Sequence, residues 1–281
     1  MSHFDLLFST VTVEPSEIFD LCYALDYPEL MEINKDNRKW RKWNLEYSAD
    51  LLSRRFPDSY VWIIRPVRKY ADSFSCFDNF VDGDVLGTPS HSDKRLSIHH
   101  LKELLNNSIH YVNSENLCKK RSKSVKPDLT CQTAETLDCN EVSCDSSIPT
   151  VLPVVIVGFS KGCIVLNQML HELGHVHKDK HVNEFVGRWK ALYWLDGGHS
   201  GEHDTWITDE TILKELTKLN LQINVHVTPF QIKDPRRPWK GKAERLFVDT
   251  LKELGADVRE VIHFEDAGYS FANHFKVLEA F

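Results

Sequence analysis

A serine with a glycine two residues to either side directly follows a long apolar run. The run begins at Pro153 as PVVIV and continues through Gly158-Phe-Ser160-Lys-Gly162 into CIVLNQMLHEL. This is the G-x-S-x-G pattern of a nucleophilic serine held on a sharp turn between a strand and a helix. Small residues at both glycine positions let such a turn close, and the start of the helix would point its dipole at developing negative charge. The pattern predicts acyl transfer by Ser160, with the backbone N–H of Lys161 as one oxyanion donor.

A histidine near the carboxyl terminus is the expected general base. A serine hydroxyl is a weak nucleophile near neutral pH, so it needs a histidine to take its proton and an acid to fix the imidazole tautomer. His274 lies in EDAGYSFANHFKVLEAF, where the last predicted strand leads into the last predicted helix. We expect His274 to be the base, the alternative being a surface residue at the start of that helix. His263 falls within the predicted strand VREVIHF and is interpreted as a packed or edge residue.

Two aspartates compete for the role of the acid. Both follow predicted strands and lie between the serine and the histidine, which is the chain order for this kind of triad. Asp234 follows the next-to-last strand in INVHVTPFQIKDPRRPW, and Asp196 follows the preceding strand in YWLDGGHSGEHDTW. We favour Asp234, although an aspartate before Pro235 is also a common turn residue. Asp196 is the alternative acid.

The glycines after Asp196 form a candidate substrate loop. Gly197, Gly198 and His199 would let the backbone approach a ligand at the carboxyl edge of a strand. A flexible turn is the competing interpretation. His199 and His203 have the spacing of two metal ligands on a helix, but the glycines disfavour a helix there. We therefore expect neither a metal nor a cofactor.

Strands and helices alternate on both sides of the serine. Apolar runs bounded by turn residues predict strands, and apolar residues recurring every three or four positions predict helices. The predicted strands are Tyr60–Ile64, Val154–Val157, Trp189–Leu195, Ile223–Thr228 and Val258–Phe264. The predicted helices are Leu45–Phe56, Ile98–Val112, Cys163–Leu173, Glu210–Leu219, Lys240–Leu254 and Phe271–Ala280. This alternation predicts an α/β fold of the α/β-hydrolase type, with a mostly parallel sheet and helices on both faces.

The composition favours one soluble globular domain and excludes several partners. With 281 residues, 42% of them hydrophobic, and a formal charge of -7, the chain lacks the basic surface that nucleic acid requires. No stretch reaches the roughly 18 consecutive apolar residues of a membrane span. The 7 cysteines show no C-x-x-C spacing and are interpreted as free thiols. The polar segment from about 114 to 149 has no helix or strand period, and we interpret it as a disordered insertion in a single domain spanning residues 1–281.

Several long motifs together resemble one known family. They are GFSKGCIVLNQMLHEL, YWLDGGHSGEHDTWIT, HVTPFQIKDPRRPWKGK, NHFKVLEAF and, further upstream, WNLEYSADLLSRRFPDSYVWIIRP with FSCFDNFV. From about Trp43 to Phe281 the chain resembles the mitochondrial proteins named after a human chromosome-two open reading frame, a little-characterised group regarded as α/β-hydrolases. The resemblance implies a mitochondrial location and a serine-hydrolase site at Ser160, with Asp234 and His274 as its partners.

The first 42 residues depart from that family. Its members open with a strand and loop of the type VVYFPGD, a loop that would supply a second oxyanion donor, whereas LLFSTVTVEPSEIFDL has no Pro-Gly-Asp turn. The first twenty residues also show no targeting segment, which leaves a cytosolic location as the alternative. We expect a hydrolase of small ester, thioester or amide substrates. The alternative is a binding or regulatory module with a protein partner, in which the serine turn persists without chemistry.

Overall fold

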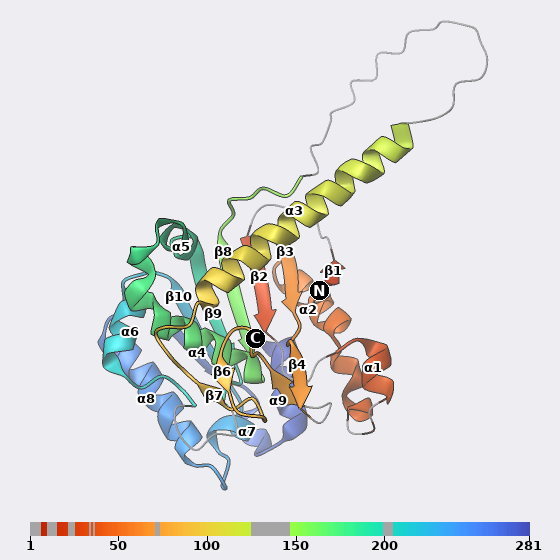
Figure 1. The fold of residues 1–281 in the computed structure, drawn as a ribbon. Helices are drawn as coiled ribbons and strands as arrows, with labels where there is room; N and C mark the ends of the chain where they lie inside the picture. The colour runs from red at the N-terminus through yellow and green to blue at the C-terminus, as the bar shows by residue number, and fades with distance from the viewer. Residues whose placement is uncertain are drawn as a thin grey trace, which may run out of the picture. The chain divides into compact units, whose positions relative to one another are not determined.

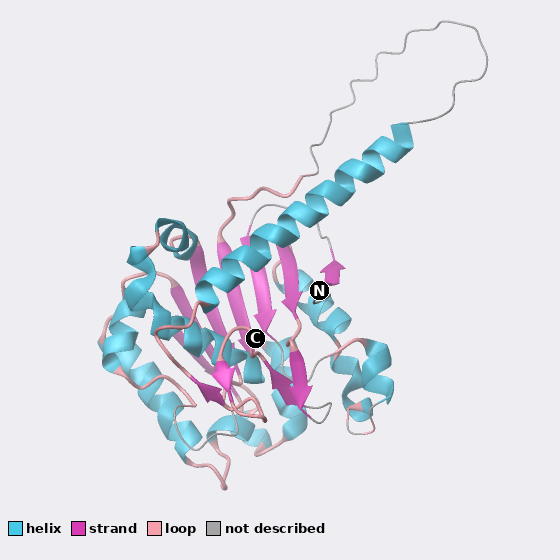
Figure 2. Ribbon diagram, viewed as in Figure 1, coloured by secondary structure: helices cyan, strands magenta, loops and turns pink. Residues whose placement is uncertain are grey.

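A mostly parallel sheet forms the centre of the molecule. The computed structural model describes residues 7–9, 16–21, 26–33, 35, 37–70, 74–124, 147–198 and 205–281. Among them, seven strands pair in the order β1-β3-β2-β8-β9-β10-β11 (Figures 1 and 2). Their bounds are β1 Leu7–Ser9, β2 Ser16–Leu21, β3 Ser59–Ile64, β8 Val154–Phe159, β9 Trp189–Leu195, β10 Gln222–Val227 and β11 Val258–Ile262. β1 pairs antiparallel with β3, and the other pairs are parallel, which confirms the expected α/β class.

The helices and the short strands connect the strands of this sheet. The helices are α1 Pro28–Ile33, α2 Leu45–Arg55, α3 Ser97–Ser124, α4 Cys163–Glu172, α5 Lys180–Val186, α6 Glu210–Thr217, α7 Pro229–Ile232, α8 Trp239–Glu253 and α9 Phe271–Ala280. Two small hairpins precede α3, formed by β4 Arg68–Tyr70 with β5 Phe74–Cys76 and by β6 Asp82–Gly83 with β7 Pro89–Ser90. In the described part of the chain, no helix is long and apolar enough to cross a membrane.

Alternate residues of the central strands are buried against helices on opposite faces. Tyr193 of β9 packs on one face with Phe56 and with Phe281, beside a cluster supplied by α2 and α9. Its neighbour Trp194 packs on the other face, where its ring meets Phe247 of α8 and its Nε1 donates to an amide oxygen on α4. Since successive side chains of a strand point to opposite faces, both faces need apolar residues, and the strands read as continuous apolar runs.

The segment from 101 to 151 forms a separate compact unit. The helix predicted over 98–112 runs as α3 to Ser124, so the first part of the expected disordered insertion is helical. Within this unit, the side-chain amide of Asn113 donates to the carbonyl oxygen of Ile148 at 2.9 Å and accepts from its backbone N–H at 2.7 Å. The rest of the expected insertion, residues 125–146, lies outside the described residues. Of residues 1–42, the described part contributes β1 and β2 to the sheet.

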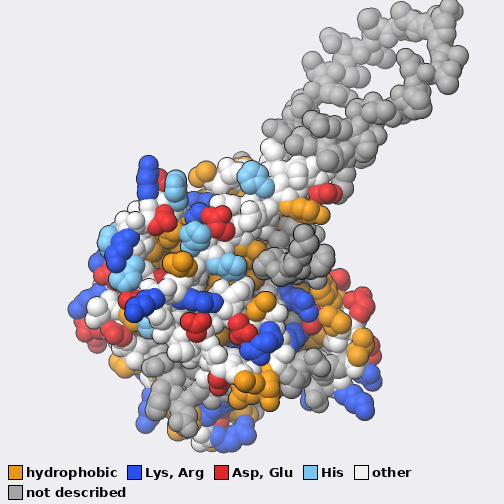
Figure 3. All heavy atoms as spheres, viewed as in Figure 1, with side chains coloured by type: hydrophobic (Ala, Val, Ile, Leu, Met, Phe, Trp, Pro, Cys, Tyr) orange, Lys and Arg blue, Asp and Glu red, His pale blue; other side chains and the backbone are white. Residues whose placement is uncertain are grey.

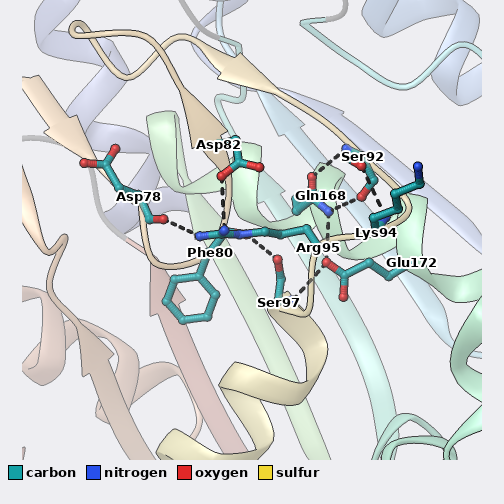
Figure 4. A network of polar contacts seen from close by, with 9 residues as sticks. All are labelled: Asp78, Phe80, Asp82, Ser92, Lys94, Arg95, Ser97, Gln168 and Glu172. Carbon is teal, nitrogen blue, oxygen red and sulfur yellow. Dashed lines mark hydrogen bonds and ion pairs between the residues drawn. The ribbon is translucent and has the colours of Figure 1, made fainter.

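A buried carboxylate joins α4 to the start of α3. Glu172 accepts from the backbone N–H of Ser97 at 2.9 Å and from the side-chain amide of Gln168 at 2.9 Å (Figure 4). It also accepts from the backbone N–H of Ile98 at 3.0 Å. A carboxylate is favourable at this position because the first N–H groups of a helix have no partner within the helix and carry partial positive charge. The same Gln168 amide donates to the carbonyl oxygen of Ser92 at 2.6 Å.

Arg95 fixes the loop that precedes α3. Its guanidinium donates to the carbonyl oxygens of Asp78 and Phe80 and forms an ion pair with the carboxylate of Asp82 at 3.1 Å (Figure 4). Together with Glu172, these contacts hold the segment from 78 to 97 against α4. That segment reaches the residue next to Ser160, as shown below.

We predict that Glu172→Gln lowers the free energy of unfolding by about 1–3 kcal/mol, because a nearly isosteric amide replaces one acceptor oxygen by a donor that faces a backbone N–H. Urea unfolding followed by circular dichroism measures the effect. The matched control is Glu184→Gln, an exposed glutamate of α5 whose side chain is 58% exposed, where the change should stay within about 0.5 kcal/mol. Equal effects of the two substitutions would contradict the role of Glu172.

Candidate active site

Ser160 stands on a strained turn between β8 and α4. Its φ angle is 51°, a left-handed conformation that costs a residue with a side chain about 1–2 kcal/mol. The turn is tight: a Cβ atom at position 158 would lie 2.9 Å from Leu166 Cδ1 and 3.1 Å from Cys163 Cα, so only glycine fits at Gly158. The predicted strand, sharp turn and helix around Ser160 are therefore present in the structure.

The serine lies where the connections of the sheet change direction. The chain passes from β2 outward to β3, and later returns to β8 on the other side of β2. In open α/β sheets, ligands bind at the carboxyl ends of strands beside such a point. Leu21, the last residue of β2, pairs with Gly158, two residues before Ser160. Residues 22–25, which follow β2, lie outside the described residues.

His274 contacts the serine from α9. Its Nε2 lies 2.8 Å from the hydroxyl oxygen of Ser160, within hydrogen-bond distance, and the imidazole is 1% exposed. The imidazole lies among aromatic rings, with centroid distances of 4.9 Å to Phe159, 5.0 Å to Phe230 and 5.7 Å to Phe271. The histidine expected from the sequence is thus brought to the serine, from the amino-terminal part of the helix instead of the loop before it. The phenylalanine rings therefore bury most of the imidazole surface.

Asp196 is the carboxylate that bonds to His274. Its Oδ2 lies 2.6 Å from His274 Nδ1 and accepts from the hydroxyl of Thr228 at 2.8 Å. Its Oδ1 accepts from the backbone N–H of Thr228 at 2.6 Å. Asp196 directly follows β9 and Thr228 directly follows β10, so two adjacent strand ends position this carboxylate. The acid kept as the alternative is therefore the one that the structure places beside the histidine.

Asp234, the favoured acid, does not contact His274. Its Oδ2 accepts from the guanidinium of Arg237 at 2.8 Å, and its Oδ1 accepts from the backbone N–H of Arg236 at 3.0 Å. Burial raises the pKa of Asp234, but these bonds outweigh it and hold the pKa below its usual value. The expectation from the sequence placed Asp234 at the end of a strand. In the structure β10 ends at Val227, and α7 intervenes and carries Asp234 away from the strand edge.

The side chain of Lys161 is buried under the loop that precedes α3. Its ammonium donates to the carbonyl oxygen of Leu86, and burial lowers the pKa of Lys161. Gly87 has a φ angle of 68°, and a Cβ atom there would lie 2.8 Å from Lys161 Nζ and 2.8 Å from Cys76 Sγ. This close packing fixes the side chain of Lys161, and the oxyanion role expected for its backbone N–H stays a prediction.

The candidate substrate loop divides into two described glycines and a histidine outside the described residues. A Cβ atom at Gly197 would lie 3.1 Å from Cys163 Sγ and 3.2 Å from a ring carbon of Trp206, so this glycine permits internal packing. Gly198 lines the cavity described next, with a φ angle of 130°. His199 and His203 lie among residues 199–204, which the structure does not describe. Among the described residues, no three His, Cys, Asp or Glu side chains gather as a metal site would need.

A cavity of about 160 Å³ opens beside Ser160 and His274. Apolar atoms come from Phe74, Phe230 and Phe271, and polar groups from Lys161, Gln231, Arg237 and Lys240. Sequence reasoning missed Gln231 and Lys240 as site residues, although both lie in the segment HVTPFQIKDPRRPWKGK that carries the family resemblance. They reach the cavity because α7 and the start of α8 follow the carboxyl end of β10, next to the strand that carries Asp196.

His263, which the sequence did not favour as the general base, contacts another histidine. His263 Nε2 lies 2.8 Å from His226 Nδ1, and the two rings stack at 5.1 Å. Burial lowers the pKa of His226 to about 3, so this ring is neutral near pH 7. His263 is a packed residue, as interpreted from the sequence.

Comparison with known proteins identifies the family of this chain. The sequence model of the C2orf69 family matches residues 23–257. The chain belongs to this family. The mouse mitochondrial protein C2orf69 homolog is 38% identical over 274 residues, which cover 91% of this chain and 75% of the mouse protein. Human mitochondrial protein C2orf69 is 38% identical over 91% of this chain and 71% of its own length, and the zebrafish homolog is 37% identical over 91% and 70%.

These relatives are named as mitochondrial proteins, and the mitochondrial location implied by the resemblance is confirmed. Among solved structures, an uncharacterized protein from Bacillus cereus aligns with a TM-score of 0.42 at 14% identity, over 98% of this chain and 60% of that one. That likeness carries no argument about the fold. In this member of the C2orf69 family, the site is defined by the contacts from Ser160 through His274 to Asp196.

The left-handed turn at Ser160 predicts an inverted preference between glycine and alanine. Ser160→Gly should unfold with a free energy about 1 kcal/mol higher than Ser160→Ala, because glycine adopts the turn without strain. The matched pair is Ser53→Gly and Ser53→Ala in the helix α2, where glycine should be less stable than alanine by about 1 kcal/mol. Chemical denaturation of the four variants gives both differences. The same sign at both positions would show that Ser160 is not held in this turn.

Proposed function

We propose that this chain is a mitochondrial serine hydrolase of the α/β-hydrolase type, acting on an ester, thioester or amide. The observation that carries the proposal is the unbroken hydrogen-bond chain from Ser160 through His274 to Asp196, at 2.8 and 2.6 Å, among buried side chains. Serine, acid and histidine follow one another in the order that this type of hydrolase uses, with the nucleophile on a strained strand-to-helix turn.

In the proposed reaction, the Ser160 hydroxyl oxygen attacks the substrate carbonyl while His274 Nε2 takes its proton. The imidazolium returns this proton to the leaving group, whose bond to the carbonyl carbon breaks and leaves an acyl-serine. A water molecule then attacks the acyl-serine with His274 again as the base, which releases the acid and restores the serine. Overall, one water adds across one acyl bond.

Asp196 keeps this histidine in the reactive form. Its carboxylate accepts from Nδ1–H, so Nε2 is the basic nitrogen that faces the serine. The two bonds from Thr228 hold the carboxylate in place, so its charge can stabilise the imidazolium that forms in the transition state. The phenylalanine rings around His274 strengthen this interaction because they lower the local dielectric constant.

The first experiment is labelling of purified protein with a fluorophosphonate probe, which reacts with activated serines. We expect labelling of Ser160 that Ser160→Ala abolishes. Asp196→Asn should slow it by about 10³-fold or more, because the amide favours the wrong imidazole tautomer. Asp234→Asn makes the same chemical change at the aspartate that bonds to arginine, and it should cost much less.

Circular dichroism of each variant controls for folding. If folded protein does not react with the probe while a control hydrolase does, the proposal is overturned. The alternative, a binding module, would then be favoured. Equal losses in Asp196→Asn and Asp234→Asn would contradict the assignment of Asp196 as the acid. Both outcomes can be read from intact-protein mass spectra.

A further inference from the structure

The cavity beside Ser160 is lined by basic side chains without a carboxylate among its described lining residues. Lys161, Arg237 and Lys240 all contribute to its wall. Arg237 is bonded to Asp234, and the ammonium of Lys161 to a backbone carbonyl. A cavity whose walls carry one sign of charge concentrates small ions of the opposite sign. The lining therefore favours an anionic ligand.

Lys240 is the cation of this cavity that forms no ion pair or hydrogen bond with the described residues. It lies in the first turn of α8, is 1% exposed, and its Nζ is 5.8 Å from the ring centroid of Phe230. Within the described residues, no carboxylate forms an ion pair with it. Asp234, which follows α7, bonds instead to Arg236 and Arg237. A buried ammonium without a partner is costly, so a structure retains one where a ligand supplies the partner.

The neighbouring carboxylate of the triad is also fully engaged. Both oxygens of Asp196 accept hydrogen bonds, from His274 and from Thr228. Burial lowers the pKa of Lys240 to about 8, which still leaves the ammonium mostly protonated near pH 7. The side chain thus presents a positive charge to the cavity. The described carboxylates that attract it, Asp234 and Asp196, form no ion pair with it.

A second polar side chain faces the same space. Gln231 is 4% exposed, and its amide oxygen has no hydrogen-bond partner among the described residues. A Cβ atom at position 198 would lie 2.8 Å from this oxygen and 2.9 Å from Lys240 Cε, so a side chain there would displace both groups. A buried amide oxygen without a partner is rare in proteins, and here a ligand O–H or N–H would satisfy it.

We propose that this pocket selects acyl substrates that carry an anionic group, a carboxylate or a phosphate, which forms an ion pair with Lys240 while the acyl carbon lies at Ser160. This inference rests on the hydrolase proposal for the reaction but not for the binding. The cavity, at about 160 Å³, is smaller than the roughly 300–1,000 Å³ of pockets for drug-sized ligands. The part of the substrate inside it is therefore short, and Phe74, Phe230 and Phe271 contact its carbon chain.

Binding to a variant without the nucleophile tests the anion site separately from catalysis. Ser160→Ala protein is titrated by isothermal calorimetry with glutarate, with phenyl phosphate, and with the neutral glutaramide. We expect binding of an anion but not of glutaramide, and the stronger of the two anions assigns carboxylate or phosphate. Anion binding here with no probe labelling of the native serine would remove the hydrolase proposal and leave the anion site standing.

Substitution of Lys240 in the same background identifies the residue responsible. Lys240→Met should weaken anion binding about 10- to 100-fold. The melting temperature of this variant should be unchanged or higher, because a buried charge without an ion-pair partner is removed. Lys240→Arg should retain part of the affinity. The matched control, Lys242→Met, changes an exposed lysine of the same helix and should leave affinity unchanged. Absence of anion binding to Ser160→Ala, or equal affinities in Lys240→Met and Lys242→Met, would overturn the proposal.

Discussion

The buried carboxylate of Asp196 connects the parts of the molecule that form the site. It is 0% exposed, and it accepts from the backbone and side chain of Thr228 and from His274. These bonds tie the end of β9 to the end of β10 and to α9, three segments that are far apart in the sequence. A charged group in a low-dielectric interior is tolerated only when its oxygens accept hydrogen bonds. Loss of any one of these bonds therefore destabilises the buried carboxylate as a whole.

The constraint at Asp196 is matched by one at Ser160. Both residues have positive φ angles, 48° at Asp196 and 51° at Ser160, and each directly follows a parallel strand. Strain of this kind persists only where the surrounding structure determines the backbone, and it concentrates at functional sites. Here it places two side chains over adjacent strand ends, where the histidine from α9 can bridge them. Charged side chains of both signs are interspersed over the face drawn in Figure 3.

Local patterns in the sequence predicted the central strands, the turn at Ser160 and the histidine. The strand over 189–195 and the helix over 271–280 have the predicted bounds, because apolar periodicity and the breaks around it are local signals. The sequence favoured Asp234 as the acid, whereas the structure places Asp196 beside His274, and a local signal for this placement was present. Thr228 followed by Pro229 is a typical helix start, with a capping threonine and proline in the first turn. That signal ends the strand before Asp234 and leaves Asp196 as the aspartate directly at a strand end.

The lining of the cavity could not be predicted in this way. Lys240 lies in the first turn of the amphipathic helix α8. The apolar pattern of this helix does not show which residues of the first turn are buried. Lys240 packs near Gly198 and Phe230, which come from other segments. The loop from 78 to 97 likewise reaches Lys161 through contacts that join distant parts of the chain, among them those of Arg95 and Glu172. Contacts between segments that are distant in the sequence depend on tertiary packing, and they produce no periodic pattern of residues in the sequence.

The charges of the cavity and of the triad act on one another. Lys240 lines the same cavity as His274, and the carboxylate of Asp196, which bonds to His274, attracts the ammonium of Lys240. In the proposed reaction, an anionic group bound to Lys240 would lie close to the positive charge that forms when the histidine takes the serine proton. Substrate charge would then lower the barrier of the chemical step as well as the dissociation constant. Binding energy used in this way raises turnover, because the interaction is stronger in the transition state than in the ground state.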